Sequence, residues 1–216
     1  MILLHDVSKF YKVRGVGTRW VLREANAVIR PGDRVGILGR NGAGKSTLMR
    51  MLGGVEFPNS GRIERRMSVS WPLARRVGLH AQISGAANAR FIARIYERDE
   101  EKLVRAVNEF AELDDYMDMP ISTYSAGMMS RLQFGLSLAM DFDCYLIDEA
   151  TGAGDERFVQ RARQALETKL RARAVVMVSH NAKHIRTFCR TGAILHDGSL
   201  TFFEDLDEAI ATYEAL

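Results

Sequence analysis

The feature that most limits how this chain can fold is the segment GRNGAGKS, residues Gly39–Ser46. It matches the pattern G-x-x-x-x-G-K-S/T at every fixed position. The apolar run RVGIL comes directly before it and TLMRMLGG directly after it, so a strand, a glycine-rich turn and a helix are predicted in that order. Such a turn wraps backbone N–H groups around an anion, and the helix dipole points its positive end at the same place. The sequence therefore predicts an α/β core with a phosphate site.

Each residue type in this segment suits phosphate binding. The glycines at 39, 42 and 44 let the backbone approach phosphate oxygens without an intervening Cβ. Lys45 is expected to reach the β- and γ-phosphates of a nucleotide, and the Ser46 hydroxyl is expected to bind Mg²⁺. We therefore predict that the chain binds a nucleoside triphosphate together with Mg²⁺; the family resemblance described below implies that the nucleotide is ATP. The nucleotide contacts expected from this segment are Gly39, Arg40, Asn41, Gly42, Ala43, Gly44, Lys45, Ser46 and Thr47.

A second motif, CYLIDEA at residues 144–150, is an apolar run that ends in two carboxylates. A buried strand places Asp148 at its carboxyl end, where open α/β sheets bind ligands. Asp148 is predicted to hold Mg²⁺, and Glu149 to orient or deprotonate the attacking water. A solvated acidic turn would have the same sequence, but the preceding phosphate segment favours the metal site. Together the two motifs predict an enzyme that hydrolyses a nucleoside triphosphate.

The chain divides into three parts by pattern. The middle, about residues 75–138, predicts helices because apolar residues such as Phe91, Ile92 and Ile95 recur at helical spacing. The last third alternates strands and helices, which is typical of βαβ units and a parallel sheet. We therefore predict one domain, with an α/β core of residues 1–74 and 139–216 and an inserted helical subdomain. The strands expected in the first third are Ile2–Leu4, Arg19–Leu22, Ala27–Ile29, Arg34–Leu38 and Ser68–Trp71.

Composition excludes several classes of protein. A net charge of +3 and a pI near 9.0 could indicate nucleic-acid binding, but the basic residues are mostly arginines spread along the chain. A solvated basic surface is favoured, and no nucleic-acid partner is expected. No run reaches the roughly 18 apolar residues that a membrane span needs, and the N-terminus lacks a signal-peptide pattern. We expect a cytoplasmic protein in which Cys144 and Cys189 are reduced packing thiols.

The segment YSAGMMSR, residues 124–131, precedes CYLIDEA and carries the family resemblance. It resembles the signature sequence of ABC ATPases, whose common form is LSGGQ followed by a basic residue and an apolar helix. Ser125 and Gly127 match that form, whereas Tyr124, Ala126 and Met128 depart from it. Taken alone, the segment would also fit the N-capped start of an ordinary helix. Its position just upstream of the Asp-Glu strand favours the signature.

Further matches extend the resemblance to ABC ATPases along the chain. The segment TGAGD contains Asp155 and resembles the D-loop, and His180 after VVMVS resembles the switch histidine. Tyr11 lies where the family places an aromatic residue that stacks on adenine, although it could instead pack against the sheet. At the start of the helical insertion, His80 or Gln82 occupies the position of the family's metal-sensing glutamine, with His80 slightly favoured. An imidazole there puts metal sensing in doubt.

The resemblance implies both a fold and a mode of assembly. The fold is a RecA-like P-loop NTPase core with a mostly parallel sheet, an antiparallel β part and the helical insertion. Ser125, Ala126 and Gly127 would contact the γ-phosphate of ATP held by a second copy of the chain. Two copies would close head to tail around two ATP molecules, and the helical subdomain would dock on polytopic membrane permease subunits.

Four segments narrow the resemblance to the ATPase of bacterial capsular polysaccharide exporters. It implies a peripheral subunit at the cytoplasmic face of the inner membrane, with the glycan contacted only through the permease. O-antigen and teichoic-acid export ATPases stay as alternatives, although no appended carbohydrate-binding domain is expected here. A soluble ABC ATPase of DNA repair or translation would have tandem motors or long coiled-coil insertions, and a small P-loop kinase would not explain YSAGMMSR. The four segments are SWPLA (70–74), NARFIARIY (88–96), the Tyr-Ser-small-Gly-Met signature and FDCYLIDEATGAGDERF (142–158).

Overall fold

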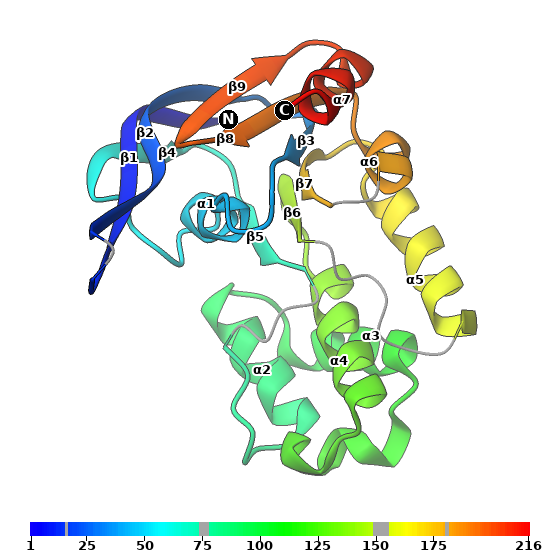
Figure 1. The fold of residues 1–216 in the computed structure, drawn as a ribbon. Coiled ribbons are helices and arrows are strands. Elements are labelled where there is room, and N and C mark those ends of the chain that lie inside the picture. Colours follow the sequence, from blue (N-terminus) through cyan, green and yellow to red (C-terminus); the bar gives the residue numbers. More distant parts are fainter. Residues whose placement is uncertain (16, 74–77, 149–155, 180–181) are drawn as a thin grey trace. The chain divides into compact units, whose positions relative to one another are not determined.

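The computed structural model contains two compact units, the core unit and the helical unit (Figure 1). The core unit comprises Met1–Pro72, Phe142–Glu149 and Ala172–Leu216. The helical unit comprises Leu73–Asp141 and Ala150–Arg171, the second of which the sequence analysis assigned to the core. The number and limits of domains stay a prediction. The structure describes residues 1–15, 17–73, 78–148, 156–179 and 182–216.

The core unit is built on two sheets. The six-stranded sheet has the order β5-β6-β7-β3-β8-β9, in which only the last pair is antiparallel. A mostly parallel sheet with an antiparallel part was predicted, and this fold class is confirmed. The strands of this sheet are β3 (Arg34–Leu38), β5 (Val69–Pro72), β6 (Cys144–Asp148), β7 (Ala174–Val178), β8 (Thr191–His196) and β9 (Ser199–Phe203). The three-stranded antiparallel sheet has the order β2-β1-β4, with β1 at Ile2–Val13, β2 at Gly17–Ile29 and β4 at Ser60–Arg65.

The antiparallel sheet differs from the sequence prediction because its strands are irregular. The expected strands Arg19–Leu22 and Ala27–Ile29 are parts of the single strand β2, and β1 continues far beyond Leu4. Register shifts interrupt the β1–β2 pairing, and Asp6 and Glu24 have positive φ angles of 48° and 45°. Such bulges break the alternation of buried and exposed residues, which hides strand continuity in the sequence. Strands β4 and β9 were not predicted because both are largely exposed and lack a buried stripe.

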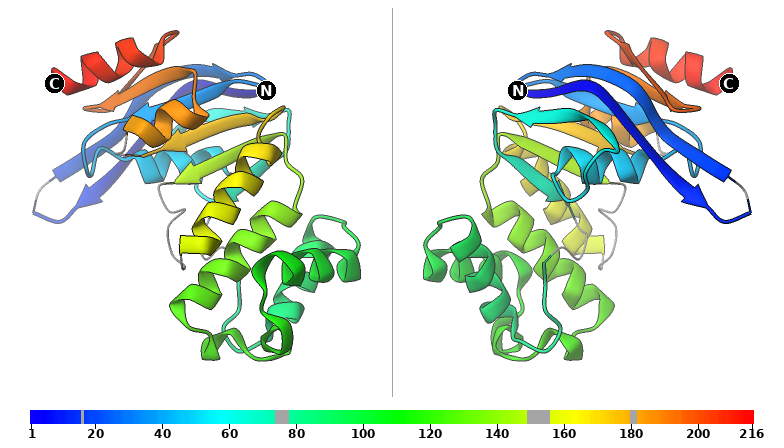
Figure 2. Two further views of the ribbon diagram at one scale, coloured as in Figure 1. Left: turned by 90° about the vertical axis from the view of Figure 1, so that its right-hand side faces the viewer. Right: turned by 90° about the vertical axis from the view of Figure 1, so that its left-hand side faces the viewer.

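Helix α1 (Lys45–Leu52) contributes to the hydrophobic core of this unit. Its Leu48, Met49, Met51 and Leu52 are at most 1% exposed and belong to a cluster with residues from both sheets. Helices α6 (Ala182–Phe188) and α7 (Leu206–Glu214) belong to the same unit, and Figure 2 shows α7 lying over β8 and β9. The burial of these four α1 side chains in the core holds α1 directly after the carboxyl end of β3.

The helical unit contains α2 to α5 and two short 3₁₀ helices. Side chains of Ser84, Asp99 and Ser125 accept backbone N–H groups at the starts of α2, α3 and α4. None of the described helices has the combined length and apolar character of a membrane span. The elements are α2 (Gly85–Ile95), α3 (Glu100–Ala111), η1 (Asp114–Asp118), η2 (Ile121–Thr123), α4 (Ala126–Ala139) and α5 (Glu156–Lys169).

Helix α2 buries Ile92, which is 5% exposed, but not the other two large apolar residues that predicted it. Phe91 and Ile95 are 50% and 57% exposed, whereas Ala89 and Ala93 are fully buried. Small side chains let this helix lie close to its neighbours in the unit. The sequence analysis predicted the helix, but it did not identify the buried face.

Candidate nucleotide-binding site

The loop between β3 and α1 requires glycine at two positions. Gly42 and Gly44 have φ angles of 81° and 107°, in the left-handed region that favours glycine. A Cβ on Gly44 would lie 2.3 Å from Cγ1 of Val21, and one on Gly42 would lie 2.7 Å from Nη2 of Arg19. The backbone at Gly44 therefore approaches β2 more closely than any other residue type allows, whereas at Gly42 it is the backbone angle that favours glycine.

Helix α1 presents its positive end to this loop. Its N-cap is Gly44 rather than a side chain, and the Leu48 N–H donates to the Gly44 carbonyl at 2.9 Å. The side chain of Lys45 is nearly buried, and its Nζ donates to the carbonyl oxygens of Gly39 and Arg40 at 2.5 and 3.1 Å. The Lys45 ammonium group and the positive end of the α1 dipole therefore both lie at this loop.

Strand register brings Asp148 to the same edge of the sheet. Asp148 pairs with Val178, and Val178 pairs in turn with Ile37, two residues before Gly39. Because parallel strands share one carboxyl edge, the end of β6 lies at the edge from which the loop departs. Asp148 is 5% exposed. Three other predicted residues, Glu149, Asp155 and His180, lie outside the described residues.

An open pocket of about 460 Å³ in the core unit gathers most of the nucleotide contacts predicted from the segment Gly39–Thr47. Ser46 and Asp148 line it, and their side chains carry oxygen donors of the kind that Mg²⁺ prefers. The donor set therefore fits this metal. Of the remaining loop residues, Gly39 and Arg40 are placed by their bonds to Lys45, and the Ala43 N–H donates to Arg40. The predicted residues that line the pocket are Tyr11, Asn41, Gly42, Gly44, Lys45, Ser46, Thr47 and Asp148.

Arg19 also lines this pocket, and the sequence analysis missed it. It pairs directly with Tyr11 across β1 and β2, and its Nη2 donates to the Gly42 carbonyl at 2.7 Å. A second cation therefore lies beside the phosphate loop. Only the register of the β1–β2 pairing could have shown that these residues share a face.

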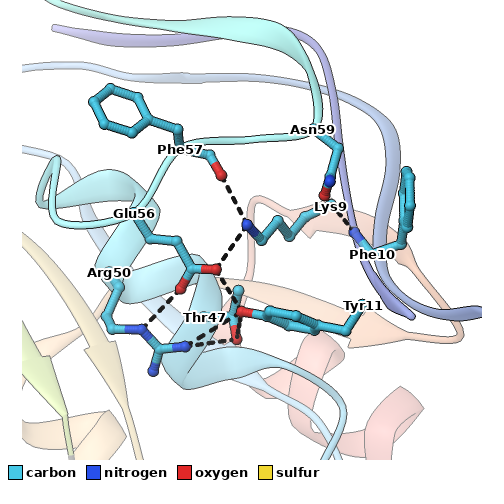
Figure 3. Close-up of polar contacts among 8 residues, drawn as sticks. All are labelled: Lys9, Phe10, Tyr11, Thr47, Arg50, Glu56, Phe57 and Asn59. Atoms are coloured by element: carbon cyan, nitrogen blue, oxygen red, sulfur yellow. Dashed lines mark hydrogen bonds and ion pairs between the residues drawn. The ribbon is translucent and has the colours of Figure 1, made fainter. Parts of the chain in front are cut away.

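A network around Glu56 was missed as well (Figure 3). The Glu56 carboxylate accepts hydrogen bonds from the Tyr11 hydroxyl at 2.5 Å and from Arg50 Nε at 2.9 Å, and it pairs with Lys9 Nζ at 2.7 Å. Arg50 Nη2 also donates to the Thr47 hydroxyl at 3.1 Å. Partial burial raises the pKa of Glu56, but the hydrogen bonds from Lys9, Tyr11 and Arg50 outweigh it and lower that pKa to about 2. The carboxylate is therefore ionised at neutral pH.

The signature residues lie in the helical unit, where Ser125 and Gly127, but not Ala126, line an open pocket of about 490 Å³. Ser125 is the N-cap of α4, and its Oγ accepts the Met128 N–H at 3.2 Å. A Cβ on Gly127 would have one neighbour within 4 Å, the Ser125 Oγ at 3.9 Å. Arg131 lines the same pocket. The segment is thus an N-capped helix start, and it also presents a hydroxyl, a helix N-terminus and a cation at one place.

His80 and Gln82 are both exposed in the helical unit, just before α2. Asn88, which is fully buried, accepts the His80 N–H at 2.8 Å and donates to the His80 carbonyl at 3.2 Å. The Gln82 N–H donates to Nδ1 of His80 at 3.3 Å, so this ring nitrogen acts as an acceptor. The choice between the two residues as the metal-sensing group stays a prediction.

Comparisons with known proteins agree with this geometry. Residues 22–152 match the family model described as ABC transporter. The chain is 44% identical to the capsule polysaccharide export ATP-binding protein CtrD of Neisseria meningitidis over the full length of both. It is 36% identical to the teichoic acids export ATP-binding protein TagH of Staphylococcus epidermidis, over 92% of this chain and 76% of TagH. The dimeric post-hydrolysis structure of the ATP-binding cassette MJ0796, bound to ADP and Pi, shares the fold, with a TM-score of 0.79 and 22% identity over 95% and 99% of the two chains.

Proposed function

The chain belongs to the ABC transporter family, and we propose that it is the ATP-hydrolysing subunit of a transporter that exports capsular polysaccharide across a bacterial inner membrane. The observation that carries this proposal is the 44% identity to a capsule export ATP-binding protein over both full lengths. The teichoic-acid relative is less similar, at 36% identity, which supports capsule export over that alternative. The family resemblance inferred from the motifs is confirmed.

ATP binding and hydrolysis use residues of the core unit. Lys45 and the loop backbone hold the β- and γ-phosphates, and Tyr11 stacks on the adenine. Ser46 and Asp148 hold Mg²⁺, which neutralises phosphate charge when bound. Glu149 takes the role of orienting or deprotonating the attacking water, assisted by His180. The shared pocket of Tyr11, Lys45, Ser46 and Asp148 supports these assignments.

A second copy of the chain completes each site. Ser125 and Gly127 bind the γ-phosphate of ATP held by the opposite copy, and Asp155 contributes to the same interface. The exposed hydroxyl at the tip of α4 supports this role, because it presents a phosphate-binding group outward from the chain. The dimeric state of the MJ0796 cassette also supports it. Closure of the two copies around two ATP molecules transmits work to the membrane partner.

The membrane partners are polytopic permease subunits, on which the helical unit docks. Exposed apolar side chains on α2, Phe91 and Ile95, support such a docking face. The chain then acts as a peripheral subunit at the cytoplasmic face of the inner membrane. The glycan is contacted only through the permease.

Deletion of the gene tests this function. Surface capsule should disappear while polysaccharide accumulates inside the cell, and the wild-type gene should restore export. A gene encoding Glu109→Gln, which changes an exposed carboxylate on α3, should restore export equally. Normal capsule after deletion contradicts the proposal. Loss of a teichoic acid or O-antigen instead favours the alternative exporters, and a wholly soluble protein whose ATPase responds to DNA or ribosomes favours a non-transport ATPase.

The catalytic assignment has a separate test. Glu149→Gln should bind ATP as the wild type does, hydrolyse it poorly and accumulate as a closed dimer that size-exclusion chromatography detects. Brisk turnover by this variant would remove Glu149 from the catalytic role.

A further inference from the structure

Tyr11 lies on a part of β1 that has little support from its own sheet. Strand β4 pairs with β1 from Ile2 to Ser8, and the described residues of β1 beyond that point pair with β2. Figure 2 shows this β1–β2 hairpin extending away from the rest of the antiparallel sheet. A two-stranded ribbon is marginally stable by itself. The orientation of the Tyr11 ring therefore depends on contacts from outside the hairpin.

The strongest of these contacts comes from Glu56, in the segment that follows α1. The Tyr11 hydroxyl donates to Glu56 Oε1 at 2.5 Å, and Arg50, in the last turn of α1, donates to Oε2 at 2.9 Å (Figure 3). The Tyr11 hydroxyl also lies 3.3 Å from the hydroxyl of Thr47 in the first turn of α1. One carboxylate thus ties the tip of the hairpin to the helix that begins at the phosphate loop.

Lys9 restricts the ring further. Its Nζ lies over the Tyr11 ring, 5.2 Å from the centroid, and is bound to the Glu56 carboxylate and to the Phe57 carbonyl at 2.7 and 2.8 Å. Because Lys9 is 8% exposed and its ammonium group is held by two acceptors, the ammonium group covers that face of the ring. A nucleotide base is then expected to stack on the opposite face.

We propose that Glu56 is a positioning residue for nucleotide binding: it holds the Tyr11 ring in a fixed relation to α1, so that the base platform and the phosphate loop form one preorganised surface. This inference rests on the proposed stacking role of Tyr11. A preorganised platform spares the nucleotide the entropy of ordering the hairpin. Loss of the carboxylate therefore weakens ligands that carry a base and leaves the binding of a bare triphosphate unchanged.

The test compares the affinities of ATP and inorganic tripolyphosphate for the full chain. Tyr11→Phe keeps the ring and removes the hydroxyl, and Glu56→Gln removes the charge. Each should weaken ATP binding about 5- to 10-fold with tripolyphosphate affinity unchanged, and the double variant should be no weaker than Glu56→Gln alone because both break one interaction. Glu64→Gln is the matched control, since Glu64 pairs with Arg66 on an exposed part of the same unit, and both affinities should stay at the wild-type value.

Two outcomes overturn the positioning role. The first is wild-type ATP affinity in both Glu56→Gln and Tyr11→Phe while Tyr11→Ala loses affinity. This result refutes the positioning of Tyr11 by Glu56 and leaves the stacking role of Tyr11 intact. The second is an equal loss of tripolyphosphate and ATP affinity in both variants, which assigns Glu56 to the support of α1. Wild-type affinity in Tyr11→Ala instead refutes the stacking role of Tyr11 itself.

Discussion

The phosphate pocket of the core unit and the signature helix tip of the helical unit are built in opposite ways. In the phosphate pocket Lys45 and Asp148 are nearly buried, and Gly44 has no room for a Cβ. At the helix tip Ser125 and Ala126 are exposed, and a Cβ on Gly127 would meet almost nothing. A site that grips its ligand within one chain needs such close packing. A group that serves a ligand held by another molecule must instead be presented outward.

The largest effect is expected for Lys45→Ala, which removes the buried cation of the phosphate pocket. Removing the buried ammonium leaves phosphate charge without its cation, so ATP affinity should fall about 100-fold or more and turnover should be lost. Isothermal titration with ATP measures the change. Lys102→Ala on exposed α3 should bind ATP normally. Unchanged affinity in Lys45→Ala refutes the phosphate assignment.

Ser125→Ala tests the other side of the contrast. Loss of a phosphate donor should reduce turnover about 100-fold, while ATP affinity of the unpaired chain should not change. A mixture of Ser125→Ala and Lys45→Ala chains should regain turnover, because each mixed dimer holds one site with both groups intact. A mixture as inactive as its components contradicts the shared site. Ser84→Ala is the matched control, since it removes the equivalent cap of α2, where Ser84 accepts the Ala87 N–H at 3.1 Å.

Acid titration compares a partly buried carboxylate of the core unit, Glu56, with an exposed carboxylate of the helical unit, Glu101. The pKa of Glu56 falls from 4.5 to about 2 on folding, so its contribution to stability is present above pH 4.5 and is lost as the pH drops toward 2. The contribution is at most about 3 kcal/mol. Urea unfolding should therefore show that the stability difference between wild type and Glu56→Gln shrinks from pH 5 to pH 2. Glu101→Gln, which breaks an exposed pair with Arg90 in the helical unit, should show little difference at any pH.

The smallest effect is expected for Ala126→Gly, which brings one of the three departing positions back to the common form of the signature. Ala126 is the first, exposed residue of α4, so glycine should lower helix stability by less than about 1 kcal/mol. Turnover should stay within about two-fold of wild type, because Ala126 is exposed and its methyl group can be removed without opening a cavity. A steady-state ATPase assay and thermal unfolding measure both effects. A large change in turnover would show that the tip is tightly packed in the working dimer.

Local sequence patterns predicted the parts of the fold that depend on short-range order. The buried run at 144–147 is a strand, and the glycine segment joins a strand to a helix as expected. Strand β2 was divided in two because the positive φ of Glu24 and the accompanying bulges break its alternation. Exposed strands such as β9 carry no stripe of buried residues that a sequence could reveal.

In the candidate site, too, the residues that belong to short sequence motifs were predicted and the others were missed. Lys45, Ser46 and Asp148 belong to motifs whose spacing fixes their chemistry, and the structure gathers them in one pocket. Arg19 and Glu56 belong to no motif. Their contacts reach 23 residues to Gly42 and 45 residues to Tyr11, so only tertiary folding brings these groups together.

The cap of α4 also restricts which residue can occupy position 125. The Ser125 oxygen accepts the Met128 N–H, and its own hydroxyl proton is still available to a second acceptor. Aspartate and asparagine cap helices equally well, yet a carboxylate has no proton to offer at neutral pH and would repel an incoming anion. A hydroxyl can accept from its own helix while donating away from it, and aspartate cannot. Aspartate, although a strong helix cap elsewhere, should therefore be excluded from this position.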